Sequence, residues 1–332
     1  MPQLVDRYGR AHTYLRISVT DRCNLRCAYC MPEEEMTWME RSKILSFEEI
    51  IRVARIAAGM GIEKIRVTGG EPLVRNDCES LLAGLKAIPG IRSLALTTNA
   101  VLLERKLPAI RDSVDSLNIS LDTFRRDRFL ELTRRDALDD VLGAIDAVLA
   151  AGYLNLKINA VVLRGINDDE ILDFARFTAD RPVAVRFIEF MPFEGNGWSD
   201  GRCVTMLEMM TTLERKYALE RIPDGPSPIS RDYRLRNRKT GRLHMGTVGV
   251  IASMSEPFCD TCSRLRITAE GKLMPCLHSA LEFDLRTPLR CGADDAAIEQ
   301  IFLQALDAKP AEHPTAEEMV AAASHVMIQI GG

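Results

Sequence analysis

This sequence of 332 residues lacks both a long apolar run and a secretion signal. No apolar run is long enough to cross a bilayer, so we expect no membrane-spanning helix. The first seven residues do not show a basic stretch followed by an apolar one, and we therefore expect a cytoplasmic protein. Strong positive charge is also lacking, since the net charge is −4. This argues against a general nucleic-acid binder, although a local group of arginines can still bind a small polyanion.

Internal repeats and low-complexity tracts are absent as well, and the composition is that of an ordinary globular chain. Hydrophobic residues make up 46% and charged residues 27%, which is enough apolar material for a sizeable core. The length allows one large domain or two. The nine cysteines are numerous for a chain without a secretion signal. They indicate a reducing compartment, and metal binding or catalysis rather than disulfides.

Three of these cysteines, Cys23, Cys27 and Cys30, follow the spacing C-x3-C-x2-C directly after an extended apolar stretch. Thiolates are the preferred ligands of iron–sulfur clusters, and a cubic cluster has four irons. Three sulfurs therefore leave one iron open to a small molecule. Zinc would need a fourth ligand at short spacing, which His12 does not provide, and a disulfide framework would need a secreted chain. The spacing thus predicts a 4Fe–4S cluster with one open iron.

Apolar stretches typical of strands alternate with helical patterns through the first 190 residues. We expect strands over 15–20, 64–67, 93–97, 116–120, 156–162 and 183–190, with helices over 46–58, 77–88, 102–111, 138–150 and 168–179. Six such units predict a parallel sheet in an open, partial barrel, since a closed barrel needs eight. The chemistry of such a barrel lies at the C-terminal ends of its strands.

The pattern changes after Trp198. We expect a helix over 205–219, a turn-rich linker over 223–228, and short strands over 233–236 and 244–251. This predicts two domains, a partial barrel over 1–222 and a C-terminal region over 223–332. The final Gly331 and Gly332 alone would predict a disordered tail.

A second set of cysteines lies in the C-terminal region. Cys259 and Cys262 form a C-x2-C pair, and Cys276 follows after thirteen residues that read as two strands joined by a glycine turn. Such a hairpin would return Cys276 to the pair and create a second three-sulfur site. A zinc ribbon with His278 or Cys291 as fourth ligand is the alternative. The other cysteines, Cys78 and Cys203, match no motif and read as structural, as does Cys291 unless it is that ligand.

The first cysteine loop, with Tyr29 before its last cysteine, resembles the signature of the radical S-adenosylmethionine (SAM) enzymes. The turn Thr68-Gly69-Gly70-Glu71-Pro72 resembles the GGE motif of the same family. Other features point to a narrower family. They are the two cysteine sets, the segments 65–73 and 187–192, Arg264-Leu265-Arg266 and the terminal diglycine. Together they resemble the GTP 3′,8-cyclases, the molybdenum cofactor biosynthesis protein A family. The resemblance implies an incomplete (βα)6 TIM-type barrel whose open side is closed by a cluster-binding extension.

The resemblance also implies roles for particular residues. Cys23, Cys27 and Cys30 would hold one 4Fe–4S cluster, and Cys259, Cys262 and Cys276 a second one that meets the guanine of GTP. The SAM contacts would be Tyr29, Gly70, Ser120 and Met191. The GTP contacts would be Arg16, Arg66, Thr97, Lys157, Arg264, Leu265 and Arg266. The diglycine end of the chain would reach into the active site.

The chemistry implied is radical cyclisation. An adenosyl radical derived from SAM would take the hydrogen from ribose C3′, and the carbon radical would attack guanine C8. The product would be (8S)-3′,8-cyclo-7,8-dihydroguanosine 5′-triphosphate. The implied partners are a reducing electron donor and cyclic pyranopterin monophosphate synthase, with a homodimer as a further expectation.

Two readings compete with this one. A peptide-modifying radical enzyme usually has more C-terminal cysteines, which ligate its extra clusters fully. A ferredoxin-like carrier or a zinc scaffold would not need six βα units, a Gly-Gly-Glu turn and a set of arginines. Arg186 on the sixth strand is a further anion-binding candidate. Because a charge inside a barrel is costly unless paired, we expect a ligand or Glu189 to neutralise it.

Overall fold

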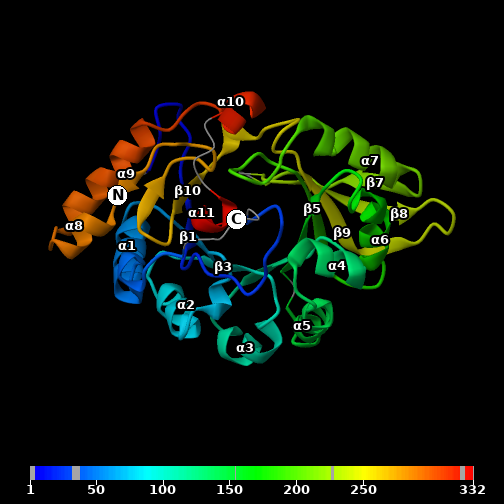
Figure 1. The fold of residues 1–332 in the computed structure, drawn as a ribbon, viewed down its shortest axis with the longest axis horizontal. Coiled ribbons are helices and arrows are strands. Elements are labelled where there is room, and N and C mark those ends of the chain that lie inside the picture. The colour runs from blue at the N-terminus through cyan, green and yellow to red at the C-terminus, as the bar shows by residue number, and fades with distance from the viewer. Residues whose placement is uncertain (1–3, 32–37, 154, 226–227, 322–325, 332) are drawn as a thin grey trace.

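The computed structural model describes residues 4–31, 38–153, 155–225, 228–321 and 326–331. Its core is a single sheet of twelve strands in the order β12-β11-β10-β1-β2-β3-β4-β5-β6-β9-β8-β7. The sheet curves, and helices α1 to α6 cover its outer face (Figure 1). The turn-rich stretch expected over 223–228 includes residues 226–227, which lie outside the described residues.

The six predicted βα units are present, and their strands run parallel. The strands are β1 (Tyr14–Ser18), β2 (Lys64–Thr68), β3 (Ser93–Thr98), β4 (Ser116–Ser120), β5 (Leu156–Val162) and β6 (Ala184–Glu189). The helices are α1 (Phe47–Gly59), α2 (Cys78–Lys86), α3 (Leu103–Ile110), α4 (Arg126–Thr133), α5 (Leu138–Ala150) and α6 (Ile171–Phe177). The capping box that begins α1 is formed by Ser46 and Glu49, as its sequence predicts.

The C-terminal part of the chain lengthens this sheet at both edges. Strand β10 (Arg264–Ile267) pairs parallel to β1, and β9 (Leu243–Ile251) pairs parallel to β6. The remaining strands pair antiparallel outside these two: β7 (Tyr217–Arg221), β8 (Arg231–Asn237), β11 (Lys272–Met274) and β12 (Phe283–Asp284). The hairpin β10–β11 is the one predicted between Cys262 and Cys276.

Three features of the chain differ from the sequence prediction, and the first is that helix α4 was not predicted. The helix expected over 205–219 ends early: α7 spans Met206–Glu214, and Tyr217 already begins β7. Pairing of Tyr217 with Asn237 in β8 decides this, since tertiary pairing overrides local helical propensity. Four C-terminal helices were also not predicted: α8 (Arg286–Arg290), α9 (Asp295–Asp307), α10 (Ala316–Ala321) and α11 (Met327–Ile330).

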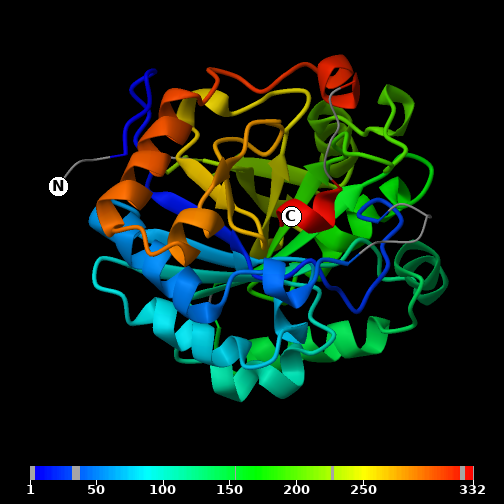
Figure 2. The ribbon, with the colours of Figure 1, turned by 60° about the vertical axis from the view of Figure 1, so that its left-hand side comes forward.

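The C-terminal end of the chain also bears on function. Helix α11 lies inside the curve of the sheet in both views, not outside it (Figure 1, Figure 2). The domain boundary at 222/223 remains a prediction, and β7 and β8, on either side of it, pair with each other. Within the described segments, no helix has the length and apolar character that crossing a membrane requires.

Candidate active site

The first cysteine loop is anchored by the unpredicted helix α4. Main-chain N–H groups of Arg26 and Ala28 donate to the carbonyl oxygens of Thr133 and Leu132, at 2.9 and 3.0 Å. Inside the loop, the N–H groups of Cys30 and Met31 both donate to the carbonyl oxygen of Cys27. These bonds fix the curvature of the loop before any cofactor binds.

The Gly-Gly-Glu turn supports the same loop from the other side. The Glu71 carboxylate is buried and accepts hydrogen bonds from the N–H of Asn99 at 2.6 Å and from the Thr98 hydroxyl at 2.8 Å. Asn99 in turn donates its amide to Cys23 Sγ at 3.5 Å. Gly70 packs against the chain just before the loop, because a Cβ at this position would lie 2.9 Å from the Asp21 carbonyl oxygen. Glycine is therefore required for this close approach.

The three thiols fit an iron–sulfur cluster in their chemistry. Burial raises the pKa of Cys23 to about 11, and burial together with repulsion from Cys30 raises the pKa of Cys27 well above its usual value. Burial and repulsion from Cys23 also raise the pKa of Cys30. Thiols that repel one another in this way lie close together, and a cationic metal centre would reverse the shift by stabilising the thiolates.

The concave face of the sheet carries polar side chains in register. Because side chains alternate along a strand, Leu15 and Ile17 pack into the hydrophobic core under the helices, while Tyr14 and Arg16 lie on the concave face. Residues paired across neighbouring strands form rows. These rows are Arg264–Tyr14–Lys64, Arg266–Arg16–Arg66, Thr97–Asn118–Lys157 and Ser120–Asn159–Arg186.

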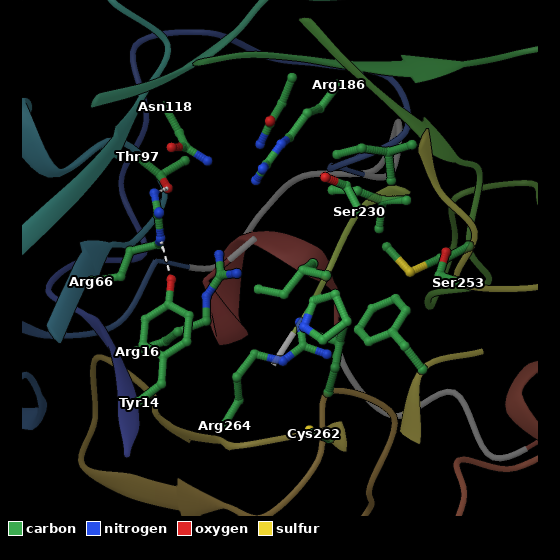
Figure 3. A pocket seen from close by; sticks show the side chains of 18 of the residues that line it. Tyr14, Arg16, Arg66, Thr97, Asn118, Arg186, Ser230, Ser253, Cys262 and Arg264 are labelled. Carbon is green, nitrogen blue, oxygen red and sulfur yellow. Dashed lines mark hydrogen bonds between the residues drawn. The ribbon is translucent and has the colours of Figure 1, made fainter. Parts of the chain in front are cut away.

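Positive charge dominates this face. Arg66 donates to the Tyr14 hydroxyl at 2.5 Å and to Thr97 Oγ1 at 3.0 Å (Figure 3). Burial, followed by the charges of Arg186, Arg66 and Lys64, lowers the pKa of Lys157 to about 8. Burial likewise lowers the pKa of Arg16 to about 10. Buried cations at such density need an anionic ligand, and a triphosphate matches the paired donors of arginine.

The second cysteine set lies beside these rows. Cys259 begins a short 3₁₀ helix, Cys259–Thr261, and Cys262 and Cys276 flank the hairpin β10–β11. Burial raises the pKa of Cys259, with Cys276 and Cys262 adding repulsion. Burial alone would raise the pKa of Cys262, but Arg264 and Lys309 outweigh it and lower the pKa to about 7. In the described part of the chain, no three Cys, His, Asp or Glu side chains are arranged to hold a single metal ion.

A single cavity of about 500 Å³ brings both cysteine sets together. It is large enough for nucleotide-sized ligands. Among the residues predicted for the site, those that line it are Arg16, Tyr29, Cys30, Arg66, Thr97, Ser120, Lys157, Met191, Cys259, Cys262, Arg264, Arg266 and Cys276. Figure 3 shows Arg16, Arg66, Arg186 and Arg264 pointing into it from different strands.

Four predicted site residues are not among those that line the cavity. Cys23 and Cys27 lie behind Cys30 in the same loop, and Gly70 packs against residues 21–22. Leu265 is fully buried in the hydrophobic core, because its side chain points away from the face that carries Arg264 and Arg266. Its assignment to GTP remains a prediction.

The prediction that Glu189 would neutralise Arg186 was wrong. Arg186 forms an ion pair with Asp232 on β8, at 2.9 Å. Glu189 is instead fully buried and accepts hydrogen bonds from the N–H groups of Met206, Met254 and Ser255. Position along β6 explains the difference, since Arg186 and Glu189 are three residues apart and so point to opposite faces.

The chain end takes part in the site. The Gly331 carbonyl oxygen accepts a hydrogen bond from Arg266 Nη1 at 2.6 Å. Gly331 has φ of 74°, and a Cβ there would lie 2.8 Å from Thr68 Cγ2. The disorder expected from the glycines alone is thus wrong for Gly331, while Gly332 lies outside the described residues. Only a residue without a side chain fits at position 331, between Arg266 and Thr68.

Sequence reasoning missed several residues that line the cavity. Tyr14 and Lys64 lie two positions before the predicted Arg16 and Arg66, so period-two alternation could have found them. Asp122 follows Ser120 and accepts a hydrogen bond from the Tyr29 hydroxyl at 2.5 Å. Asn118 and Asn159 each have a buried side-chain oxygen without a hydrogen-bond partner among the described residues. Nothing in the sequence distinguishes these two from ordinary strand residues.

Comparison with solved structures supports the fold, and comparison with family models gives the class, which is that of the radical SAM enzymes. The structure of Streptococcus suis SuiB bound to S-adenosylmethionine matches with a TM-score of 0.60 over 89% of this chain and 69% of that chain. At 15% identity the match speaks for the fold alone. The family model "Radical SAM superfamily" matches residues 17–178, and "Molybdenum Cofactor Synthesis C" matches residues 183–315.

Curated relatives identify the family more narrowly. The GTP 3′,8-cyclase of Heliobacterium modesticaldum is 46% identical, covering 99% of this chain and 100% of that protein. The mitochondrial GTP 3′,8-cyclase of Arabidopsis thaliana is 44% identical, over 99% of this chain and 83% of that protein. The chain belongs to the radical SAM GTP 3′,8-cyclase family of molybdenum cofactor biosynthesis.

Proposed function

We propose that this GTP 3′,8-cyclase divides its chemistry between two iron–sulfur clusters on opposite walls of one cavity. Cys23, Cys27 and Cys30 would hold the cluster that binds SAM, which membership of the radical SAM class already implies. Cys259, Cys262 and Cys276 would hold the second. The observation that carries the proposal is that Cys30 and all three C-terminal cysteines line the same cavity.

The SAM side would lie at the C-terminal ends of the first parallel strands. Ser120 ends β4, and Met191 follows β6, so both are at the edge from which Cys30 also faces the cavity. Tyr29 is oriented by its hydrogen bond to Asp122, which leaves its main chain available for the ligand. Gly70 would offer main-chain groups to the amine of SAM, because no side chain intervenes.

The GTP side would be the rows of cations. Arg16, Arg66 and Lys157 would bind the triphosphate, with Thr97 holding Arg66 in position. Arg264 and Arg266 lie on β10 beside the second cysteine set, where they would meet the guanine end of the nucleotide.

The first cluster, held by Cys23, Cys27 and Cys30, would supply the electron for reductive cleavage of SAM, the chemistry that would lead to removal of hydrogen from ribose C3′. The task of this chain's own residues is to hold C3′ near SAM and guanine C8 near C3′, while excluding water. A reducing donor and cyclic pyranopterin monophosphate synthase are the partners that we propose. A homodimer remains a prediction.

The test is the Cys259→Ser variant. We expect it to cleave SAM reductively, because hydrogen bonds from α4 and Glu71, both distant in the chain from Cys259, anchor the first cysteine loop. It should form no cyclised product from GTP. Normal cyclisation by this variant would refute a role for the second set.

An iron count separates the second cluster from the zinc alternative. Anaerobically reconstituted protein should contain about eight irons per chain, four for each cluster. The structure leaves His278 at the cavity wall, stacked on Phe193 with ring centroids 5.4 Å apart, and Cys291 exposed at the end of α8. About four irons with one zinc would instead favour the ribbon.

A further inference from the structure

Two buried cations outside the predicted site hold the main chain around the second cysteine set. Lys309 follows α9 and is 2% exposed, and Arg10 lies in the N-terminal segment and is 9% exposed. Neither residue is among those that line the cavity. Both side chains donate hydrogen bonds to main-chain carbonyl oxygens at or near the cysteines.

Lys309 bridges the two strands of the cysteine hairpin. Its Nζ donates to the carbonyl oxygen of Arg264 at 3.0 Å and to that of Pro275. Arg264 lies two residues after Cys262, and Pro275 directly precedes Cys276. One ammonium group therefore fixes the separation of these two ligands.

Arg10 holds the third ligand. Its Nη1 donates to the carbonyl oxygen of Cys259 at 2.9 Å and to that of Ala311 at 2.6 Å, while Nη2 donates to Pro310 at 2.7 Å. Asp6 orients the guanidinium through Nε at 2.6 Å. Since Pro310 and Ala311 follow Lys309 directly, the two cations act on one continuous segment.

That segment also reaches a ligand sulfur. Burial raises the pKa of Cys259, and the main chain of His313 opposes this shift by favouring the thiolate. The His313 ring contacts His278, which follows Cys276 by two residues, with centroids 5.7 Å apart. Residues 309–313 thus contact the surroundings of all three cysteines.

Charge gives the second line of argument. Among the described residues no carboxylate forms an ion pair with Lys309, although a buried ammonium needs an anion nearby. Burial lowers the pKa of Lys309, and the thiolate forms of Cys262 and Cys276 oppose that shift. Three thiolates around an iron–sulfur core form a net negative group, which would serve as that anion.

We infer that Lys309 and Arg10 are positioning residues for the second cluster, because they fix the main chain around its three cysteines. The positive charge of Lys309 also makes the reduction potential of this cluster more positive. The inference rests on the proposed function, because it requires that cluster. A positive charge beside a cluster stabilises its reduced, more negative state. Neither residue has a role in SAM cleavage.

The experiment compares Lys309→Met with Lys272→Met, a lysine of the same hairpin that lies near Asp284 instead. Iron content and a redox titration followed by electron paramagnetic resonance are measured on reconstituted full-length protein. We expect Lys309→Met to lose part of its second-cluster iron, and the remainder to titrate at a more negative potential. Lys272→Met should match the wild type.

Arg10→Gln provides a second variant if Lys309→Met does not fold. It should reduce the iron of the second cluster while SAM cleavage by the first is retained. Unchanged iron content and unchanged potential in a folded variant would overturn the inference. Wild-type protein with only about four irons would instead refute the proposed second cluster itself, so the two failures are distinguishable.

Discussion

Arg66 on β2 donates a hydrogen bond from Nε to the hydroxyl oxygen of Tyr14 on β1, at 2.5 Å. The two residues come from adjacent rows of the concave face, and Lys64 lies over the Tyr14 ring at 4.6 Å. Burial alone would raise the pKa of Tyr14, but the charges of Arg66, Arg16 and Lys64 outweigh it and lower the pKa to about 7. A phenolate thus offsets part of the cationic charge until an anion binds.

The first prediction concerns this phenol. Ligand-free protein should show tyrosinate absorption near neutral pH that Tyr14→Phe lacks, and GTP should shift the titration to higher pH because its phosphates replace the anion. Tyr153→Phe is the control, since burial raises the pKa of Tyr153. Titration of Tyr14 at an ordinary value, with or without GTP, would contradict the assignment.

The same shift has a consequence for stability. The folded-state pKa of Tyr14 lies below its unfolded value of 10.0, so its contribution is fully present above pH 10 and is lost as the pH falls through about 7. The free energy of unfolding of ligand-free wild type, relative to Tyr14→Phe, should therefore rise between these limits. Denaturant unfolding at a series of pH values measures this difference, and a constant difference would argue against it.

The second prediction concerns Arg266→Ala. Loss of a charged hydrogen-bond donor is worth about 1.5–3 kcal/mol, so affinity for GTP should fall roughly ten- to a hundredfold. Affinity for SAM should change much less, although the contact of Arg266 with Gly331 is also lost. Equilibrium binding of each ligand provides the measurement, and equal losses for both would count against the assignment to GTP.

The third prediction concerns Gly70→Ala. The added Cβ would collide with the main chain of residues 21–22, which leads directly into Cys23. Main chain cannot move aside as a flexible side chain can, so the cysteine loop must shift. We expect iron to be lost from the first cluster, together with SAM cleavage. Gly59→Ala, where a Cβ meets nothing within 4 Å, is the matched control and should retain both.

The fourth prediction concerns Asn118, between Thr97 and Lys157 in its row. Its buried side-chain oxygen can only accept a hydrogen bond, so a phosphate oxygen cannot satisfy it, whereas a ribose hydroxyl can. Wild type should therefore bind GTP more tightly than its 2′-deoxy or 3′-deoxy analogue. Asn118→Ala should reduce that preference roughly five- to tenfold.

Asn159→Ala is the comparison for this experiment, because it removes the same group from the neighbouring strand. It should leave the preference of GTP over its deoxy analogues unchanged. If Asn118→Ala instead weakened binding of GTP and of both analogues equally, the amide would be acting on the phosphates.

Strand and helix patterns were sufficient for the parallel core, because each βα unit buries its own apolar face and needs little information from elsewhere. The cysteine sets were also recognisable, since three thiols within eight residues suit few other roles, and their role as cluster ligands stays a prediction. Helix α4 and the strand β7 could not be predicted. The first has a weak apolar pattern, and the second forms only because β8 pairs with it.

What the sequence determined by itself is the chemistry of the chain: two sets of thiols, a glycine turn, and arginines at alternate positions of its strands. These follow from local spacing and from the limited roles of cysteine and glycine. Only the tertiary structure decided that β10 lies beside β1, which aligns Arg266 with Arg16 and Arg66 although Arg266 follows them by 250 and 200 residues in the chain. Sheet pairing between distant segments depends on the packing of the whole core, and no local pattern encodes it.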